Sequence, residues 1–319
     1  MNKSTLKYIG KRVIISIITL LVILAVLFIM IKFLPGTPFN NEKLSPAQRA
    51  AIMAKYGLDQ QIEKGVEFIV NNSYLKNMLT GDFGVSFNMY KDMPVATLVG
   101  DAAQISFSLG ISAVIFGTVI GMALGVFAAL HKNTFWDTFA TILSVIGVSV
   151  PSFVFALLIL IFLGSQLHIL PTMYDSNDAI YSSIMPVLAL SVGVIANVAR
   201  FTRTEMISVL GSEYMTLAKA KGLDKNTLIM KHALRNALIP VITILAPILV
   251  NLMTGTMVVE KICSVPGLGT LLIGSILTND YNIIMACSFL YAAMYIIMML
   301  VIDVSYGIID PRIRLGKDD

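Results

Sequence analysis

Charged residues are scarce in this sequence. Only 13 % of its 319 residues are charged, whereas 56 % are hydrophobic, and the mean hydropathy is +0.81. A water-soluble domain of this length needs more charge to cover its surface, so the composition excludes an ordinary soluble protein. We therefore expect lipid to be the main solvent of the chain.

Cysteine, histidine and catalytic motifs are also scarce. The two cysteines, Cys263 and Cys287, form neither a disulfide framework nor a metal-ligand spacing, and no metal site is expected. The chain has no G-x-x-x-x-G-K-[ST], H-E-x-x-H or G-x-S-x-G motif, and the terminal "LGKDD" lacks the spacing and the hydroxyl of a phosphate loop. No catalytic residue and no cofactor bound by this chain are expected, so any ATP must be hydrolysed by another polypeptide.

Long apolar stretches are what the sequence does contain. Each is long enough to predict a membrane-spanning helix, which makes the fold class an all-α polytopic membrane protein. The first follows four basic residues, but it is too long for the apolar region of a signal peptide and is expected to be retained. The six predicted spans are 13–31, 102–130, 137–166, 184–205, 238–260 and 281–308.

Glycines in the second span carry a further signal. The segment "GTVIGMALG" places Gly117, Gly121 and Gly125 four residues apart, on one face of a helix. Small residues let membrane helices approach closely, so this face predicts a packing seam, with a hinge as the alternative.

The basic residues predict the orientation, because Lys and Arg concentrate in cytoplasmic loops. The short loops 167–183 and 261–280 hold only Lys261, and are expected outside. Both termini are then cytoplasmic. The cytoplasmic segments would be 1–12, 131–136, 206–237 and 309–319.

The long segment 35–100 lies outside in this orientation. Its stretch "SPAQRAAIMAKYG" offers Ser45 as an N-cap, Pro46 at the first helical position and Gly57 as the end. A second helix is expected over 60–79. We interpret the segment as a small extracellular helical elaboration between spans one and two.

The charged stretch "GSEYMTLAKAKGLDKNTLIMKHALRNALIPVIT", residues 211–243, separates two spans. Ser212 is a candidate N-cap with Glu213 in the first turn, Gly222 ends that helix, and Asp224 can cap the next one. These patterns predict two short helices near the membrane surface. They leave open a headgroup-binding loop, a plain connector or a protein-docking element, whose contact face would include Ala218 and Ala220.

This stretch resembles the EAA loop of permease subunits from ABC importers. Ala218, Gly222 and Ile239-Pro240 occupy the positions of that pattern, whereas Thr216 and Leu217 replace its acid and first Ala, as is usual in the peptide and nickel branch. The segments "ARFTRTEM", "HALRNALIPV", "VVEKICSVPGLGTLL" and "DPRIR" extend the resemblance over essentially the whole chain. The chain is similar to the B-type permease subunits of oligopeptide and dipeptide importers.

The resemblance implies the type I ABC importer permease fold and a set of partners. These are a second, C-type homologous permease subunit, two ATP-binding subunits that hydrolyse ATP with Mg, an extracellular or periplasmic substrate-binding protein, and membrane lipid, with no nucleic acid. The location implied is the bacterial cytoplasmic membrane. The expected division is 1–34 for the tail and first span, 35–100 for the elaboration, 101–308 for a five-helix core with its coupling loop at 206–237, and 309–319 for the tail.

The resemblance also implies residue roles. The EAA loop would dock as a coupling helix in a groove of the ATP-binding subunit, with Gly222 needed because the chain turns there and the partner approaches its backbone. The outer gate, facing the receptor, would contain Pro266, Gly267 and Gly269. The residues expected at the ATPase contact are Glu213, Tyr214, Ala218, Lys221, Gly222, Leu223, His232 and Arg235.

Polar residues inside spans are candidates for the translocation path, because they are costly to face toward lipid. Asn197 and Asn251 are the two candidates, although helix–helix hydrogen bonding explains Asn251 equally well. Arg200 and Asp303 lie near cytoplasmic ends, where an ion pair or a headgroup contact is expected instead. Trp136 is expected to be an interfacial anchor.

The cargo is the least determined property. A peptide is favoured, with oligopeptide slightly ahead of dipeptide, and a nickel chelate is the alternative because these importers share their permease motifs. A secondary transporter is a remote alternative, since it would usually show repeated halves with broken helices and buried acids.

Overall fold

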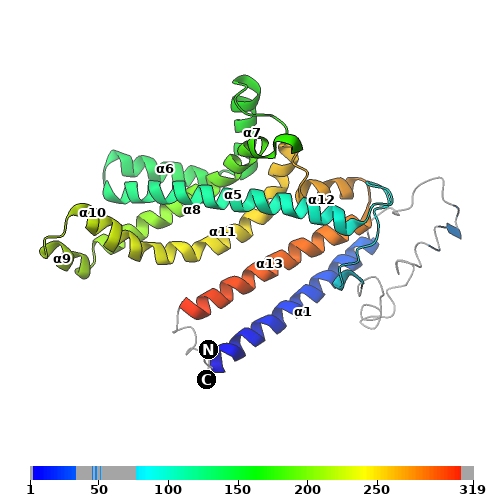
Figure 1. Cartoon of the computed structure of the whole chain (residues 1–319), viewed down its shortest axis with the longest axis horizontal. Helices are drawn as coiled ribbons and strands as arrows, with labels where there is room; N and C mark the ends of the chain where they lie inside the picture. The colour runs from blue at the N-terminus through cyan, green and yellow to red at the C-terminus, as the bar shows by residue number, and fades with distance from the viewer. Residues whose placement is uncertain (1–2, 34–44, 46, 49–50, 52–76, 310–319) are drawn as a thin grey trace. The chain divides into compact units, whose positions relative to one another are not determined.

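The structure is a computed structural model that describes residues 3–33, 45, 47–48, 51 and 77–309 (Figure 1). The described residues contain helices and turns but no strand, which confirms the all-α class. The long helices are α1 (Lys3–Phe33), α5 (Val95–Leu130), α8 (Ala179–Leu210), α11 (Arg235–Ile262) and α13 (Tyr281–Ile309). The shorter ones are α6 (Phe135–Ser149), α7 (Ser152–Ile159), η2 (Leu160–Gln166), η3 (Ser176–Asp178), α9 (Glu213–Ala220), α10 (Lys225–Thr227), η4 (Leu228–Leu234) and α12 (Leu268–Leu277).

Several of these helices are long and apolar enough to cross a membrane. Within the described part of the chain there are 4 uninterrupted helices of this kind, or up to 6 if each of two bent helix pairs forms one span. The second reading agrees with the six spans predicted from the sequence.

The third span is not one continuous helix. It breaks between α6 and α7 at Pro151, where the axis turns by 103°. The proline ring disfavours the helical region for the preceding residue, and Val150 is indeed extended, at φ −89° and ψ 126°. The single stretch 137–166 therefore becomes a sharply bent pair.

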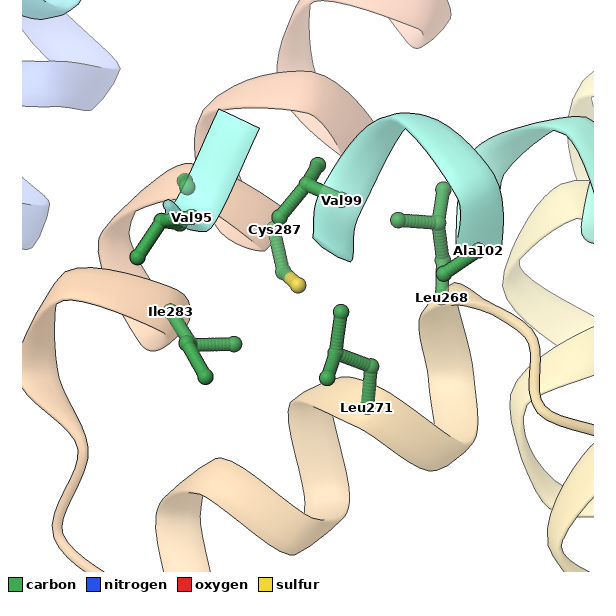
Figure 2. Close-up of a cluster of buried hydrophobic side chains, with 8 residues drawn as sticks. Val95, Val99, Ala102, Leu268, Leu271, Ile283 and Cys287 are labelled. Carbon is green, nitrogen blue, oxygen red and sulfur yellow. The ribbon is translucent and has the colours of Figure 1, made fainter. Parts of the chain in front are cut away.

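The chain divides into two compact units. Unit 1 contains residues 1–105 and 266–319, and unit 2 contains residues 106–265. In unit 1, α1 packs along α13, and α12 packs on the start of α13. A buried cluster joins α12 and α13 to the first turns of α5, as Figure 2 shows. Its members include Val95, Val99, Ala102, Leu268, Leu271, Ile283 and Cys287.

A buried carboxylate holds the loop before α5 in unit 1. Asp280 has no exposed surface, and its Oδ2 atom accepts a hydrogen bond from Ser86 Oγ at 2.6 Å. The same oxygen accepts from the backbone N–H groups of Phe87, Asn88 and Met89 at 2.9–3.1 Å. Charge-assisted bonds of this kind are stronger than neutral ones, so Asp280 fixes the loop that leads into α5.

In unit 2, glycines bring α5 and α6 against α8. A Cβ atom added to Gly125 would lie 2.5 Å from the carbonyl oxygen of Ala199, and one added to Gly117 would lie 2.6 Å from Val194 Cβ. Gly121 meets α8 similarly, and Gly147 of α6 is equally close to Ala196. The glycine seam predicted from the sequence is confirmed, and it faces α8.

Part of the segment 35–100, predicted to be an extracellular helical elaboration, lies within the described residues. Ser45 accepts a hydrogen bond from the backbone N–H of Gln48 at 3.3 Å, and Gln48 Oε1 accepts from the N–H of Ser45 at 3.0 Å. This reciprocal pair is a capping box, which supports the predicted helix start. Of the second helix, expected over 60–79, residues 77–79 are helical and the rest lies outside the described residues.

The seam gives a first prediction. Gly125→Ala forces a methyl group into backbone and Thr202 atoms of α8, so it should lower the free energy of unfolding by about 1–3 kcal/mol. Thermal unfolding in lipid nanodiscs measures the change. Gly100→Ala is the control on the same helix, because no atom lies within 4 Å of its added Cβ, and it should leave stability equal or slightly higher. Equal stability of the two variants would contradict the seam.

Candidate functional site

The candidate site is the surface segment between α8 and α11, which lies entirely in unit 2. In Figure 1, α9 and α10 lie past the end of α8, at the same end of the unit as the turn between α5 and α6. Three short elements follow α8: α9, the single turn α10, and the π-helix η4 that runs into α11. The two predicted surface helices are thus present, and the second continues into the fifth predicted span.

Local capping explains where α9 and α10 begin. Ser212 is the N-cap residue of α9, as predicted, but its hydroxyl donates back to the carbonyl oxygen of Val209 at 2.6 Å and does not cap the helix. Asp224 caps α10, and its Oδ2 accepts from the backbone N–H of Thr227 at 3.0 Å. Hydrogen bonds from Thr227 lower the pKa of Asp224, so the cap is ionised at neutral pH.

Gly222 ends α9 through its backbone conformation. Its φ angle is +79°, in the left-handed region that glycine adopts without steric cost, and its N–H donates to the carbonyl of Lys219 at 3.0 Å. No atom lies within 4 Å of a Cβ added there, so the space around Gly222 is open on this chain. The turn requires glycine, and the open space leaves room for another surface to approach.

One face of α9 is buried against the unit. Met215 is fully buried and Ala218 is 8 % exposed, and both belong to a hydrophobic cluster. The other members come from the ends of α5 and α8 and from η4 and α11: Ala129, Met206, Leu228, Ala233 and Ala237. Ala218 was expected on the outer contact face. The structure places it on the opposite face, where its small side chain lets α9 lie close to the unit.

The other face of α9 is exposed and partly apolar. Tyr214 is 43 % and Leu217 59 % exposed, and Glu213 is exposed beside them. Lys221, Gly222 and Leu223 continue this exposed surface into the turn. Leu217 was not among the expected contact residues, although its spacing of three and four residues from Tyr214 and Glu213 places it on the same helix face.

Asn236 was also not expected, and it connects two elements of the site. Its Nδ2 donates to the hydroxyl oxygen of Tyr214 and to the carbonyl of His232, both at 3.0 Å. Tyr214 on α9 is thereby tied to α11. His232 is half-buried within η4, and Arg235 is exposed at the start of α11.

The candidates for the path and the gate lie elsewhere in the chain. Asn197 is half-buried and donates to the carbonyl of Gly193 in its own helix at 2.8 Å, whereas Asn251 on α11 is exposed. Pro266 is exposed, but Gly267 and Gly269 are buried at the start of α12. The turn at 266–269 therefore initiates a short apolar helix.

The charged residues near the end of α8 form one ion pair. Arg203 binds Asp137 with Nε–Oδ1 and Nη2–Oδ2 distances of 2.5 and 2.8 Å, a bidentate geometry that was not predicted. Arg200, one turn away, has no hydrogen bond or ion pair from its guanidinium to any described residue. The side chain of Asp303 lies outside what the structure describes.

Both cysteines lie within the described part of the chain. Both thiols are buried, and burial raises the pKa of Cys263 to about 11. Among the described residues, no group of three His, Cys, Asp or Glu side chains could hold a metal ion.

The Tyr214–Asn236 contact gives a second prediction. Tyr214→Phe and Asn236→Ala each remove the same hydrogen bond, so each should destabilise the chain by about 0.5–1.5 kcal/mol, and the double variant should cost less than the sum. Unfolding by SDS titration in mixed micelles measures the cycle. Additive effects would show that the bond does not hold α9 in solution.

Comparison with known proteins assigns the chain to a family. The family model described as binding-protein-dependent transport system inner membrane component matches residues 121–315, which include α8, α9, α11 and α13. The crystal structure of an amino acid ABC transporter with histidines is more distantly similar, with a TM-score of 0.48 and 19 % identity over 68 % of this chain and 94 % of that one.

Curated relatives match over nearly their whole length. The dipeptide transport system permease protein DppB of Lactococcus lactis is 42 % identical over 97 % of this chain and 99 % of its own. The oligopeptide transport system permease protein OppB of Haemophilus influenzae is 39 % identical over the same shares, and DppB of Bacillus subtilis is 38 % identical over 98 % and 99 %. The chain therefore belongs to the family of binding-protein-dependent transport system inner membrane components, in the branch of oligopeptide and dipeptide permease proteins.

Proposed function

We propose that this chain is a permease subunit of an ATP-driven ABC importer and forms half of a translocation path for peptides. The names of the relatives, which specify dipeptide or oligopeptide transport, support a peptide cargo, and the preference for oligopeptides stays a prediction from the sequence. The other half of the path would come from a second, C-type permease subunit. A substrate-binding protein would deliver the peptide at the outer end, beside Pro266, Gly267 and Gly269.

The observation that carries the coupling role is the two-faced helix α9. Its buried face is fixed to the unit by Met215 and Ala218, while Tyr214 and Leu217 on the opposite face are exposed. Exposed apolar side chains on a rigid, short helix are typical of a protein interface. We assign this face, with Glu213, Lys221, Gly222 and Leu223, to the contact with an ATP-binding subunit.

Motion of that subunit can reach the membrane helices through the packing of α9. The cluster around Met215 and Ala218 includes Met206 of α8 and Ala237 of α11, and Asn236 adds a hydrogen bond from α11 to Tyr214. A displacement of α9 therefore acts directly on α8 and α11. Asn197 and Asn251 lie on these same two helices and are our candidates for the path.

We place the chain in the bacterial plasma membrane. In the proposed topology both termini and α9 lie on the cytoplasmic side. ATP and Mg would be bound and hydrolysed by the two ATP-binding subunits, not by this chain. The basic residues of the loops support this orientation.

The proposal gives a third prediction, on the complete complex in proteoliposomes. Gly222→Asp adds a charged side chain to the open space beside the turn, so ATP-driven uptake of labelled tri- to pentapeptides should fall at least about tenfold. Asp tolerates a positive φ better than Ala does. If backbone strain alone caused the loss, uptake by Gly222→Ala would therefore fall at least as much as uptake by Gly222→Asp. A larger loss with Asp than with Ala, at unchanged receptor binding and thermal stability, is the expected result.

Three outcomes would contradict the proposal in different ways. Full uptake by Gly222→Asp would remove the coupling role from this turn. Uptake of nickel with a metallophore, but not of peptides, would keep the coupling and change the cargo. Uptake driven by an ion gradient without ATP would indicate a secondary carrier, in which a buried carboxylate such as Glu260, near the end of α11, could carry the coupled proton.

A further inference from the structure

A small cavity at the end of unit 2 is not used by the proposed transport role. It lies between α5, α6 and α8 and has a volume of about 40 Å³. One water needs roughly 10–15 Å³ by this measure, so the cavity has room for about three waters, or one phosphate-sized group. Its walls combine apolar groups with the polar side chains of Arg200, Arg203, Thr141 and Ser144.

The charges around this cavity are not balanced. Asp137 neutralises Arg203 through two hydrogen bonds, and it also accepts from the backbone N–H of Asn133 at 2.9 Å. Arg200 has no such partner among the described residues, and neither does the hydroxyl of Thr141. Arg200 and Thr141 thus line the same cavity, both are exposed, and neither side chain pairs with a described residue, a pattern that fits an anion bound from outside the chain.

Aromatic rings show the depth of this cavity in the membrane. Phe135, Trp136 and Phe139 are 73 %, 53 % and 46 % exposed at the start of α6, where Phe135 stacks on Phe139 and meets Trp136 edge to face. Exposed aromatic rings concentrate where hydrocarbon meets headgroups. Thr141 lies five residues beyond Trp136, about 7.5 Å along the helix axis at 1.5 Å per residue, so the cavity is near the headgroup level.

An unpaired arginine at this depth is costly unless an anion compensates it. The membrane supplies a net negative group at this level in the phosphate of anionic phospholipids, whereas the choline of phosphatidylcholine compensates the charge of its own phosphate. The exposed side chains of Leu124, Phe139 and Leu143 beside the cavity offer apolar surface for its acyl chains. We infer that this cavity binds the phosphate group of one anionic phospholipid, in the cytoplasmic leaflet if the proposed orientation holds, with Arg200 as its main ligand and Thr141 as a second donor.

The single tryptophan makes the site testable in the full-length chain. Trp136 is the only tryptophan of the sequence and directly precedes Asp137, the ion-pair partner of the cavity-lining Arg203. In phosphatidylcholine nanodiscs, lipids with brominated acyl chains quench the fluorescence of a nearby tryptophan. Brominated phosphatidylglycerol should quench Trp136 at about fivefold lower mole fraction than brominated phosphatidylcholine. This is the difference expected from one basic residue near the surface. Arg200→Gln should remove this preference, and Arg200→Lys should retain part of it.

Lys132 distinguishes a site from general attraction of anionic lipid. It is exposed at the same end of the unit but does not line the cavity. Lys132→Gln should lower the preference for phosphatidylglycerol less than Arg200→Gln does. Equal effects of the two substitutions, or equal quenching by both lipids in the wild-type chain, would overturn the proposal.

The assembled complex provides the second test, because another subunit could cover the cavity. Native mass spectrometry should show one phosphatidylglycerol retained for each copy of this chain, and none with Arg200→Gln. A complex that retains no anionic lipid, or that retains it independently of Arg200, would overturn the proposal. Neither readout depends on peptide uptake. The experiments can therefore contradict the lipid site without contradicting the proposed function, and they can contradict the proposed function without contradicting the lipid site.

Discussion

Close contact of α5 and α6 with α8 is the constraint on which unit 2 depends. In lipid, helices gain little by burying apolar surface against each other, so van der Waals contact between backbones must hold them together. Gly117, Gly121 and Gly125 provide that contact, since an added Cβ on any of them would meet α8 at under 3 Å. α8 is therefore the central element of unit 2, with α5 and α6 on it and α7 and α11 packed beside it.

The functional surfaces of unit 2 are both attached to this central helix. At its end, Met206 anchors the buried face of α9, and one turn earlier Arg203 fixes the start of α6 through Asp137. The breaking of such a pair is costly because it leaves a charge unpaired in a poorly hydrated place. The proposed coupling helix and the proposed lipid cavity thus lie at one end of α8, so a lipid bound beside Arg200 would sit next to the helix that α9 moves.

Features set by local chemistry were predictable from the sequence. The apolar stretches, the glycine spacing and the cap at Asp224 depend on residues within a few turns of each other, and the structure confirms all three. The bend at Pro151 also had a local signal, because proline displaces its preceding residue from the helix. Long membrane helices often tolerate proline, as α8 does at Pro186, so the sequence alone did not separate the two cases.

Features set by distant residues were not predictable. Asp280 binds a loop 191–194 residues away, and Arg203 pairs with a carboxylate 66 residues away, so no window of sequence contains both partners. For the candidate site, the sequence located the helix and the turning glycine but not the orientation of α9. Which face is exposed depends on the cluster that receives Met215, and that cluster forms only when the ends of α5, α8 and α11 meet. This is why Ala218 was expected outside and Leu217 was not.

The central claim is that the exposed face of α9 contacts an ATP-binding subunit. Site-specific cross-linking of the assembled complex tests it most directly, with a short cysteine-reactive linker on Leu217→Cys, which is 59 % exposed, and on Met215→Cys, which is buried. The native thiols are buried and should remain unreactive. The account predicts a strong link from residue 217 to the ATP-binding subunit and none from residue 215. Absence of a link from residue 217 in an active complex would contradict it.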